Sequence, residues 1–194
     1  MRRLLSIAAL GFWFAASAQA ETIDRIAAVV EGRMITLSDV RQERSIRALL
    51  GEKALADAEL IQQLIEGYLI ETQLIGFPGI DVAEEEITAE IAKLKSKEDV
   101  PGAALHDAIL RRIRTARYFD VRFRQFLRSS EEDVRKYYDQ IFIPAARERG
   151  VNPIPPLEQV ADAIRQNVVE EQLDHEVTIW LEAVRRRSNI EILR

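Results

Sequence analysis

The chain has 194 residues and a formal net charge of -5 at pH 7, which argues against wholesale binding to nucleic acid or to anionic membranes. It contains no cysteine, so disulfide bonds and lipid attachment to a cysteine are excluded. Glycine and proline number only eight and six, so we expect no long disordered segment and a single sizeable hydrophobic core.

The first residues have the pattern of an export signal. Two arginines precede an apolar run over residues 4–16, and the small-residue site Ala18-Gln19-Ala20 follows it. This order predicts a secretory signal peptide over residues 1–20 that is cleaved before Glu21. The apolar run is shorter than the roughly 20 residues that a membrane-spanning helix needs, so we expect a soluble exported product with no stable membrane insertion.

Both ends of the mature chain carry strand patterns. Residues 23–30 and 34–37 are rich in β-favouring side chains and flank the two-residue turn Glu31-Gly32, which predicts a β-hairpin. In Asn189–Leu193 the isoleucines alternate with polar residues, as in a strand with one buried face. A lone strand cannot satisfy its own backbone groups, so we expect this strand to pair with the hairpin and both isoleucines to be covered.

Three helices are expected after the hairpin, each beginning at a residue that can cap a helix. The expected cap residues are Thr36 or Ser38, then Asp57, then Asp81. The second of these helices is apolar over so wide a face that more than one neighbouring element must cover it.

A longer helix, rich in arginine and aromatic residues, is expected over residues 103–127. Ser130 and Asp133 have the spacing of a capping box and predict a further helix that ends near Phe142. Both helices carry large apolar side chains, so each must pack against a neighbour.

Residues 143–156 hold four of the six prolines and predict an irregular connector. The last helix is expected over residues 157–187, where apolar residues recur at spacings of three and four. Together these patterns predict one mainly α-helical, multi-helix domain over residues 21–194, with a small antiparallel sheet that joins an N-terminal hairpin to a C-terminal strand.

Four segments of the chain carry a family resemblance when they are taken in order. They are IAAVVEG at residues 26–32, LIEGYLI at residues 64–70, SEEDV at residues 130–134 and WLE at residues 180–182. This order resembles the SurA-like family of periplasmic chaperones, whose N-terminal domain is related to trigger-factor-type peptide-binding domains. The resemblance spans most of the mature chain, and it implies a periplasmic protein with an apolar crevice for unfolded polypeptide.

One departure from the family is informative. In SurA-like proteins a parvulin-type prolyl isomerase domain is commonly inserted before the closing helix, whereas this chain has only residues 143–156 at that place. So short a segment cannot form such a domain. The resemblance therefore implies the chaperone core without the isomerase, and we expect a protein that is not an enzyme.

The expected function is that of an ATP-independent periplasmic chaperone, without cofactor, that binds apolar segments of unfolded exported or outer-membrane proteins. Large apolar and aromatic side chains offer geometrically tolerant contact area to varied peptides. The candidate crevice residues are Leu64, Tyr68, Phe119, Phe123, Phe126, Tyr138 and Trp180. The alternative is a non-enzymatic envelope scaffold that uses the same crevice for one specific partner or for itself, with a homodimer formed by exchange of the closing segment.

Two other patterns of the sequence bear on chemistry. His175 lies among acidic residues, but a catalytic metal usually needs three ligands in defined geometry, and a charged helical face is the commoner source of such neighbours. No nucleophile motif or phosphate-binding loop is present, so no catalytic or metal-binding residue is assigned. The arginines of residues 111–128 are expected to cover apolar surface and pair with acidic residues, or to contact anionic client segments or lipid headgroups.

Overall fold

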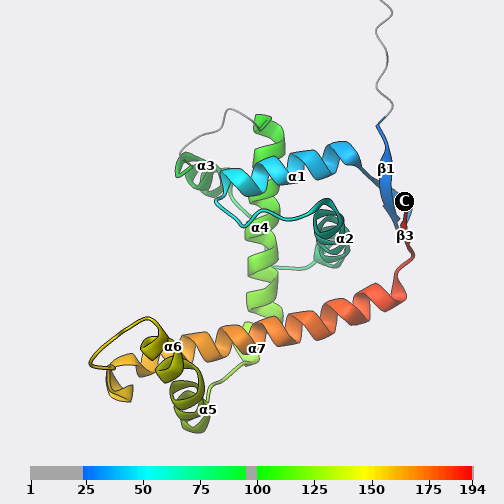
Figure 1. Cartoon of the computed structure of the whole chain (residues 1–194). Helices are drawn as coiled ribbons and strands as arrows, with labels where there is room; N and C mark the ends of the chain where they lie inside the picture. The colour runs from blue at the N-terminus through cyan, green and yellow to red at the C-terminus, as the bar shows by residue number, and fades with distance from the viewer. Residues whose placement is uncertain (1–23, 95–99, 194) are drawn as a thin grey trace, which may run out of the picture.

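The structure is a computed structural model, and it describes residues 24–94 and 100–193. The predicted signal peptide over residues 1–20 lies outside the described residues. The protein is mainly α-helical with one small three-stranded antiparallel sheet, as the sequence predicts (Figure 1).

The two ends of the chain meet in the sheet. Its strands are β1 (Ile26–Val30), β2 (Arg33–Thr36) and β3 (Ile190–Ile192), in the spatial order β2-β1-β3. β1 therefore pairs in antiparallel orientation with its hairpin neighbour on one side and with the C-terminal strand on the other. The predicted pairing between the hairpin and the closing segment is confirmed.

The hairpin turn is built by Glu31 and Gly32, whose φ angles are 50° and 81°. Positive φ at both central residues is typical of the type I′ turn, whose twist matches that of the flanking strands. The Glu31 amide donates to the carbonyl of Asn189 at 2.9 Å, and the Glu31 carboxylate accepts from the Asn189 amide at 2.6 Å. The turn is thereby tied to the residue that leads into β3.

The expectation that both isoleucines of β3 are covered is wrong for Ile192. Ile190 packs against the core cluster that contains Val184, whereas Ile192 is 47% exposed. The two side chains share one face of the strand, but Ile192 lies about 7 Å further along it. Ile190 lies near the end of the preceding helix (Leu157–Arg187) and packs against its Val184 cluster, whereas Ile192 lies too far along the strand to do so.

The helix α1 (Leu37–Leu49) begins with the capping box expected at Thr36. The Thr36 hydroxyl accepts from the Asp39 amide at 3.3 Å, and the Asp39 carboxylate accepts from the Thr36 amide at 2.8 Å. The backbone amides of Thr36 and Asp39 have no partner inside the helix, and the capping box provides one for each.

The next two helices, α2 (Asp57–Leu74) and α3 (Glu84–Ala92), begin differently from the prediction. The predicted cap residues Asp57 and Asp81 are wrong, since the cap positions are held by Ala56 and Ala83. A glutamate three residues further on replaces the hydroxyl or carboxylate cap: Glu59 accepts from the Ala56 amide at 2.9 Å, and Glu86 accepts from the Ala83 amide at 3.2 Å.

The helix α4 (Gly102–Arg122) is shorter than predicted and is followed by the 3₁₀ turn η1 (Arg124–Phe126). The Arg124 guanidinium donates to both carboxylate oxygens of Glu170, at 2.5 and 2.8 Å, and to Asp120 at 2.6 Å. The two bonds from Arg124 to Glu170 lower the pKa of that carboxyl group. They fasten η1 to the last helix, and the chain leaves the α4 direction at this point.

The helix α5 (Glu131–Tyr137) begins with the predicted capping box. The Ser130 hydroxyl accepts from the Asp133 amide at 3.1 Å, and the Asp133 carboxylate accepts from the Ser130 amide at 2.9 Å. This start is therefore encoded locally, as it is for α1.

The helical path then continues into the expected connector. A π-helical turn, η2 (Tyr138–Phe142), leads into α6 (Ile143–Glu148), so the prediction of an irregular segment over residues 143–156 is wrong for its first part. Pro144 has no amide hydrogen, and in an α-helix its ring would collide with the carbonyl four residues earlier. The wider π turn immediately before it relieves that collision and lets the helix pass through the proline.

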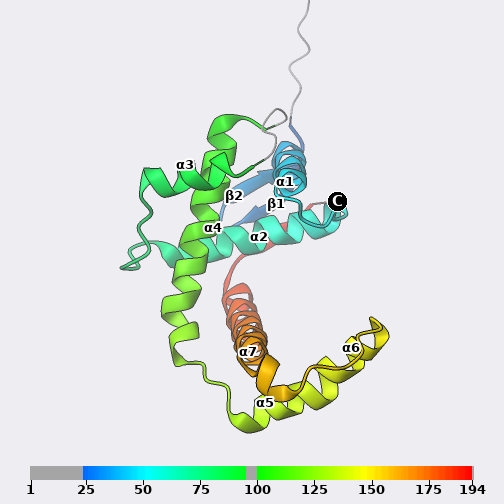
Figure 2. The ribbon, with the colours of Figure 1, turned by 90° about the vertical axis from the view of Figure 1, so that its left-hand side faces the viewer.

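The last helix, α7 (Leu157–Arg187), is about 46 Å long and joins the apolar cores of the protein. Near its C-terminal end, Val184 packs with the sheet and α2. Near its N-terminal end, Ile164 and Val168 pack with Val134 of α5. The sheet and α5–α6 therefore lie at opposite ends of α7 (Figures 1 and 2).

A chain that ends at Ser188 tests the shared sheet. It lacks β3 and so loses the half-buried Ile190, worth about 1–2 kcal/mol, together with the backbone pairing to β1. At about 2–4 °C per kcal/mol for a chain of this size, the loss of Ile190 burial alone should lower the melting temperature by roughly 2–8 °C, and the loss of the backbone pairing should lower it further. The control ends at Leu193 and keeps all of β3. Equal melting temperatures for the two chains would contradict the architecture.

Candidate binding groove

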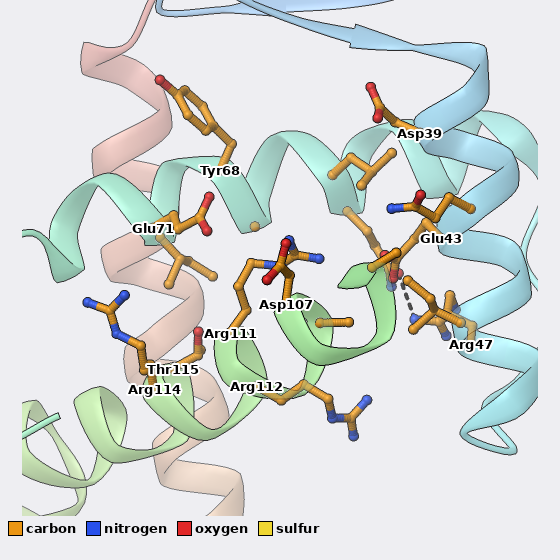
Figure 3. A pocket seen from close by; sticks show the side chains of 18 of the residues that line it. Asp39, Glu43, Arg47, Tyr68, Glu71, Asp107, Arg111, Arg112, Arg114 and Thr115 are labelled. Carbon is orange, nitrogen blue, oxygen red and sulfur yellow. Dashed lines mark hydrogen bonds between the residues drawn. The ribbon is translucent and has the colours of Figure 1, made fainter. Parts of the chain in front are cut away.

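A groove of about 690 Å³ lies between α1, α2, α4 and β2. Figure 3 shows α2 crossing behind the groove, α1 at its right and α4 in front. Its volume is within the roughly 300–1,000 Å³ typical of ligand sites in proteins. Apolar side chains and charged side chains of both signs line it.

α2 has one fully buried apolar face and a second, partly buried one that also lines the groove. Ile65 and Leu69 are buried against the sheet and α7. The residues of α2 that line the groove include Leu64, Gly67, Tyr68 and Glu71, which have the three-and-four spacing of one helix side, together with Gln63, Ile70 and Leu74. A side chain added at Gly67 would meet open space. The wide apolar face predicted for this helix is therefore shared between the core and the groove.

α4 and α1 supply the side walls. The groove face of α4 again follows helical spacing and includes Ala108, Arg111, Thr115 and Phe119. The corresponding residues of α1 are Asp39, Glu43 and Ile46. The small side chains on α4 leave the space that the groove occupies.

Ion pairs connect the elements around the groove. Glu52, in the connection after α1, pairs with Arg47 at 2.7 Å and also with Arg112 of α4. On the β2 side, Arg33 pairs with Glu71 at 3.3 Å, and its guanidinium carbon lies 4.9 Å from the centroid of the Tyr68 ring. Five of the charges that line the groove, Arg33, Arg47, Glu52, Glu71 and Arg112, are thus engaged in ion pairs.

Three other charges are left for an occupant. Among the described residues, Arg111 and Arg114 form no ion pair, although Figure 3 shows both beside the groove. Burial raises the pKa of Glu43 on the facing wall, against the opposing effect of Arg111 and Arg47. The groove therefore offers apolar contact together with cationic groups that have hydrogen-bonding capacity to spare.

The structure places three of the seven predicted crevice residues in this groove, namely Leu64, Tyr68 and Phe119. Two others lie directly behind it: Phe123 is 6.0 Å from Phe119 and 5.8 Å from Trp180, measured between ring centroids. Phe123 and Trp180 thus form an aromatic support for Phe119 and do not line the groove.

The remaining two lie elsewhere. Phe126 is 72% exposed on η1. Tyr138 stacks on Phe142 at 5.6 Å in the core between α5 and α7, and its hydroxyl donates to the carbonyl of Pro155 at 2.8 Å. The predicted set is therefore not one constellation, because large apolar residues at element junctions have the same sequence pattern as those in a groove.

The sequence allowed the arginines of residues 111–128 to contact anionic client segments but assigned none of them to the crevice, and it did not identify the acidic residues of the groove. Arg111 and Thr115 are four residues apart, on the same side of α4 as Ala108. The small residues Ala108 and Thr115 beside arginine on one side of this helix are the signal that could have identified this wall.

The comparisons with known proteins assign no family. The chain matches no family model, and no curated protein matches it significantly. Within residues 24–94 and 100–193, no group of three or more histidine, aspartate and glutamate side chains is arranged to hold a metal ion. In the same described part of the chain, no helix is both long and apolar enough to cross a membrane.

The substitution Glu43→Gln tests the burial of this carboxyl group. Because its folded-state pKa is raised, the folded protein binds the proton more tightly than the unfolded chain, and the ionised form costs stability above that pKa. The variant should therefore melt at a higher temperature than the wild type at about pH 7. The gain should shrink as the pH falls through the folded pKa, and it should vanish below the unfolded pKa of about 4.3.

Thermal melts of both proteins across this pH range provide the measurement. The control is Glu171→Gln, which makes the same chemical change at an exposed position of α7 outside the groove. A gain in melting temperature that grew as the pH fell would contradict a raised pKa of Glu43 in the folded protein.

Proposed function

We propose that this protein is an ATP-independent periplasmic chaperone that binds apolar segments of unfolded exported or outer-membrane polypeptides and carries out no chemical step. The observation that carries the proposal is the open groove between α1, α2, α4 and β2, with Leu64, Tyr68 and Phe119 in its lining. Contact with such side chains buries apolar surface of a client reversibly.

The composition of the lining fits varied clients. A site for one small molecule usually has a few converging polar groups in an apolar pocket. Here charges of both signs surround the apolar part, and long arginine side chains can follow different client sequences. Weak binding through several contacts is the expected result, because ordering a client segment offsets part of the contact energy.

The resemblance to SurA-like chaperones supports the same proposal. Two of the four segments that carry it, residues 26–32 and 64–70, contribute to β1 and to α2, next to and within the groove. The place where that family commonly has an isomerase domain is here α6 and a short connection to α7. We therefore propose binding without peptidyl-prolyl isomerisation.

Client range distinguishes this proposal from a scaffold with one partner. The mature protein, in stoichiometric amounts and without ATP, should slow the aggregation of several unrelated unfolded proteins, measured by light scattering. Suppression limited to one client, or to none, would contradict a general chaperone and favour the scaffold alternative.

The substitution Gly67→Trp tests whether clients use this groove. A helical glycine is replaced, so helix propensity does not fall, and the new side chain enters the open space over α2. Binding of an unfolded client, measured by fluorescence anisotropy, is expected to weaken by about tenfold, which corresponds to about 1.4 kcal/mol. The melting temperature should stay close to that of the wild type.

The matched control is Asn167→Trp, which puts the same side chain on an exposed face of α7 outside the groove. It should bind clients as the wild type does. If both variants bind equally well, the groove is not the client site.

A further inference from the structure

β2 is an outer strand of the sheet, because within residues 24–94 and 100–193 its strand neighbour is β1 alone. Its residues Arg33, Met34 and Ile35 line the groove. The edge of β2 that faces away from β1 is therefore next to the space between this strand and α4.

The hydrogen-bonding pattern leaves Met34 unpaired at this edge. Ala27 and Glu31 of β1 bond toward β3, since the Leu193 amide donates to Ala27 at 3.0 Å and the Glu31 amide donates to Asn189 at 2.9 Å. Backbone groups alternate in direction along an antiparallel strand, so Ala28 and Val30 bond toward β2. Their partners are Ile35 and Arg33. Met34, between these two, directs its amide and carbonyl away from β1.

No described residue takes up these two groups. Among residues 24–94 and 100–193, neither the amide nor the carbonyl of Met34 forms a hydrogen bond outside the sheet, and Met34 is 57% exposed. Unpaired strand edges are ready to pair with another extended segment. Here the edge and the groove provide backbone groups and side-chain space at the same place.

We propose that the client segment binds in extended conformation as a fourth strand along the free edge of β2, with its alternate side chains in the groove. This inference rests on the proposed function and specifies how the client is held. Met34 supplies one donor and one acceptor to the client backbone, which is independent of client sequence. Side chains directed into the groove contact α2 and α4, where Leu64 and Phe119 lie.

The charges define the chemistry of the segment further. Arg111 and Arg114 line the groove on α4 and have no ion pair within the described chain. A carboxylate accepts hydrogen bonds from guanidinium in favourable geometry. The fitting occupant is therefore an extended segment of β-favouring residues that carries an acidic side chain.

Met34→Pro is the direct test. Proline lacks the amide hydrogen and projects its ring into the edge, but an outer strand tolerates it where the amide faces away from the sheet. The hairpin bonds of Arg33 and Ile35 should therefore persist. The probe is a fluorescently labelled peptide of about eight residues, with alternating valine and threonine and one central glutamate. Its Kd should rise by about tenfold or more, from the loss of one hydrogen bond and the steric block.

Ile192→Pro is the matched control. Ile192 lies opposite Ala28 on the other outer strand, so by the same alternation its amide also faces away from β1. This variant should bind the peptide as the wild type does. Equal binding by wild type and Met34→Pro, or weakening by Ile192→Pro alone, would overturn the proposal.

A second measurement keeps the wild-type protein. The peptide is made with N-methyl groups on one alternate set of its amides, or on the other set. Only the set that faces β2 should weaken binding by about tenfold or more. If both sets weaken binding equally, or neither does, strand pairing is refuted even where Met34→Pro fails to fold.

These experiments distinguish a wrong binding mode from a wrong function. If the wild type slows client aggregation and the Met34→Pro variant does so equally, only the binding mode is wrong. If the wild type neither binds the peptide nor slows aggregation, the proposed function itself is wrong.

Discussion

The pairing of β1 with strands from both ends of the chain is the interaction on which the rest of the structure depends. Ala28 and Val30 of β1 are completely buried. On one side, β2 leads directly into the Thr36 cap and so sets the direction of α1. On the other, β3 fixes the end of α7, whose Val184 packs with Ile65 of α2. The positions of α1 and α2 around the groove therefore follow from the order of three short strands.

Features with local physical causes were predictable from the sequence. The Glu31-Gly32 turn, the capping boxes at Thr36 and Ser130, and the long apolar stripe of α7 each depend on residues within a few positions of one another. Features that depend on distant neighbours were not. Pro144 reads as a helix breaker until the π turn before it is seen, and Tyr138 reads as a crevice residue until its stacking on Phe142 is known. The groove residues Leu64 and Tyr68 were found because α2 is apolar on more sides than one neighbour can cover, whereas nothing in the spacing of Glu43 indicated burial.

Two unfavourable local features coincide at the groove. A glycine within a helix costs about 1 kcal/mol relative to alanine, and Gly67 lies in the middle of α2. A partly buried carboxyl group loses hydration, and Glu43 is such a group. Natural sequences tend to depart from local stability rules at functional sites. The coincidence of both features on the lining of one groove therefore agrees with a binding site there, independently of the aromatic residues.

The meeting of the chain ends also determines when the protein can finish folding. Glu31 and Asn189 are 158 positions apart, so β3 can join β1 only when this long intervening stretch of chain brings the two strands together. Until then β1 lacks one neighbour, and the apolar face under Ile190 stays open. Contacts of such long sequence separation form slowly, because a large loop must close before they contribute. The helices can form early from local signals, but the sheet that positions them is completed only when β3 joins β1.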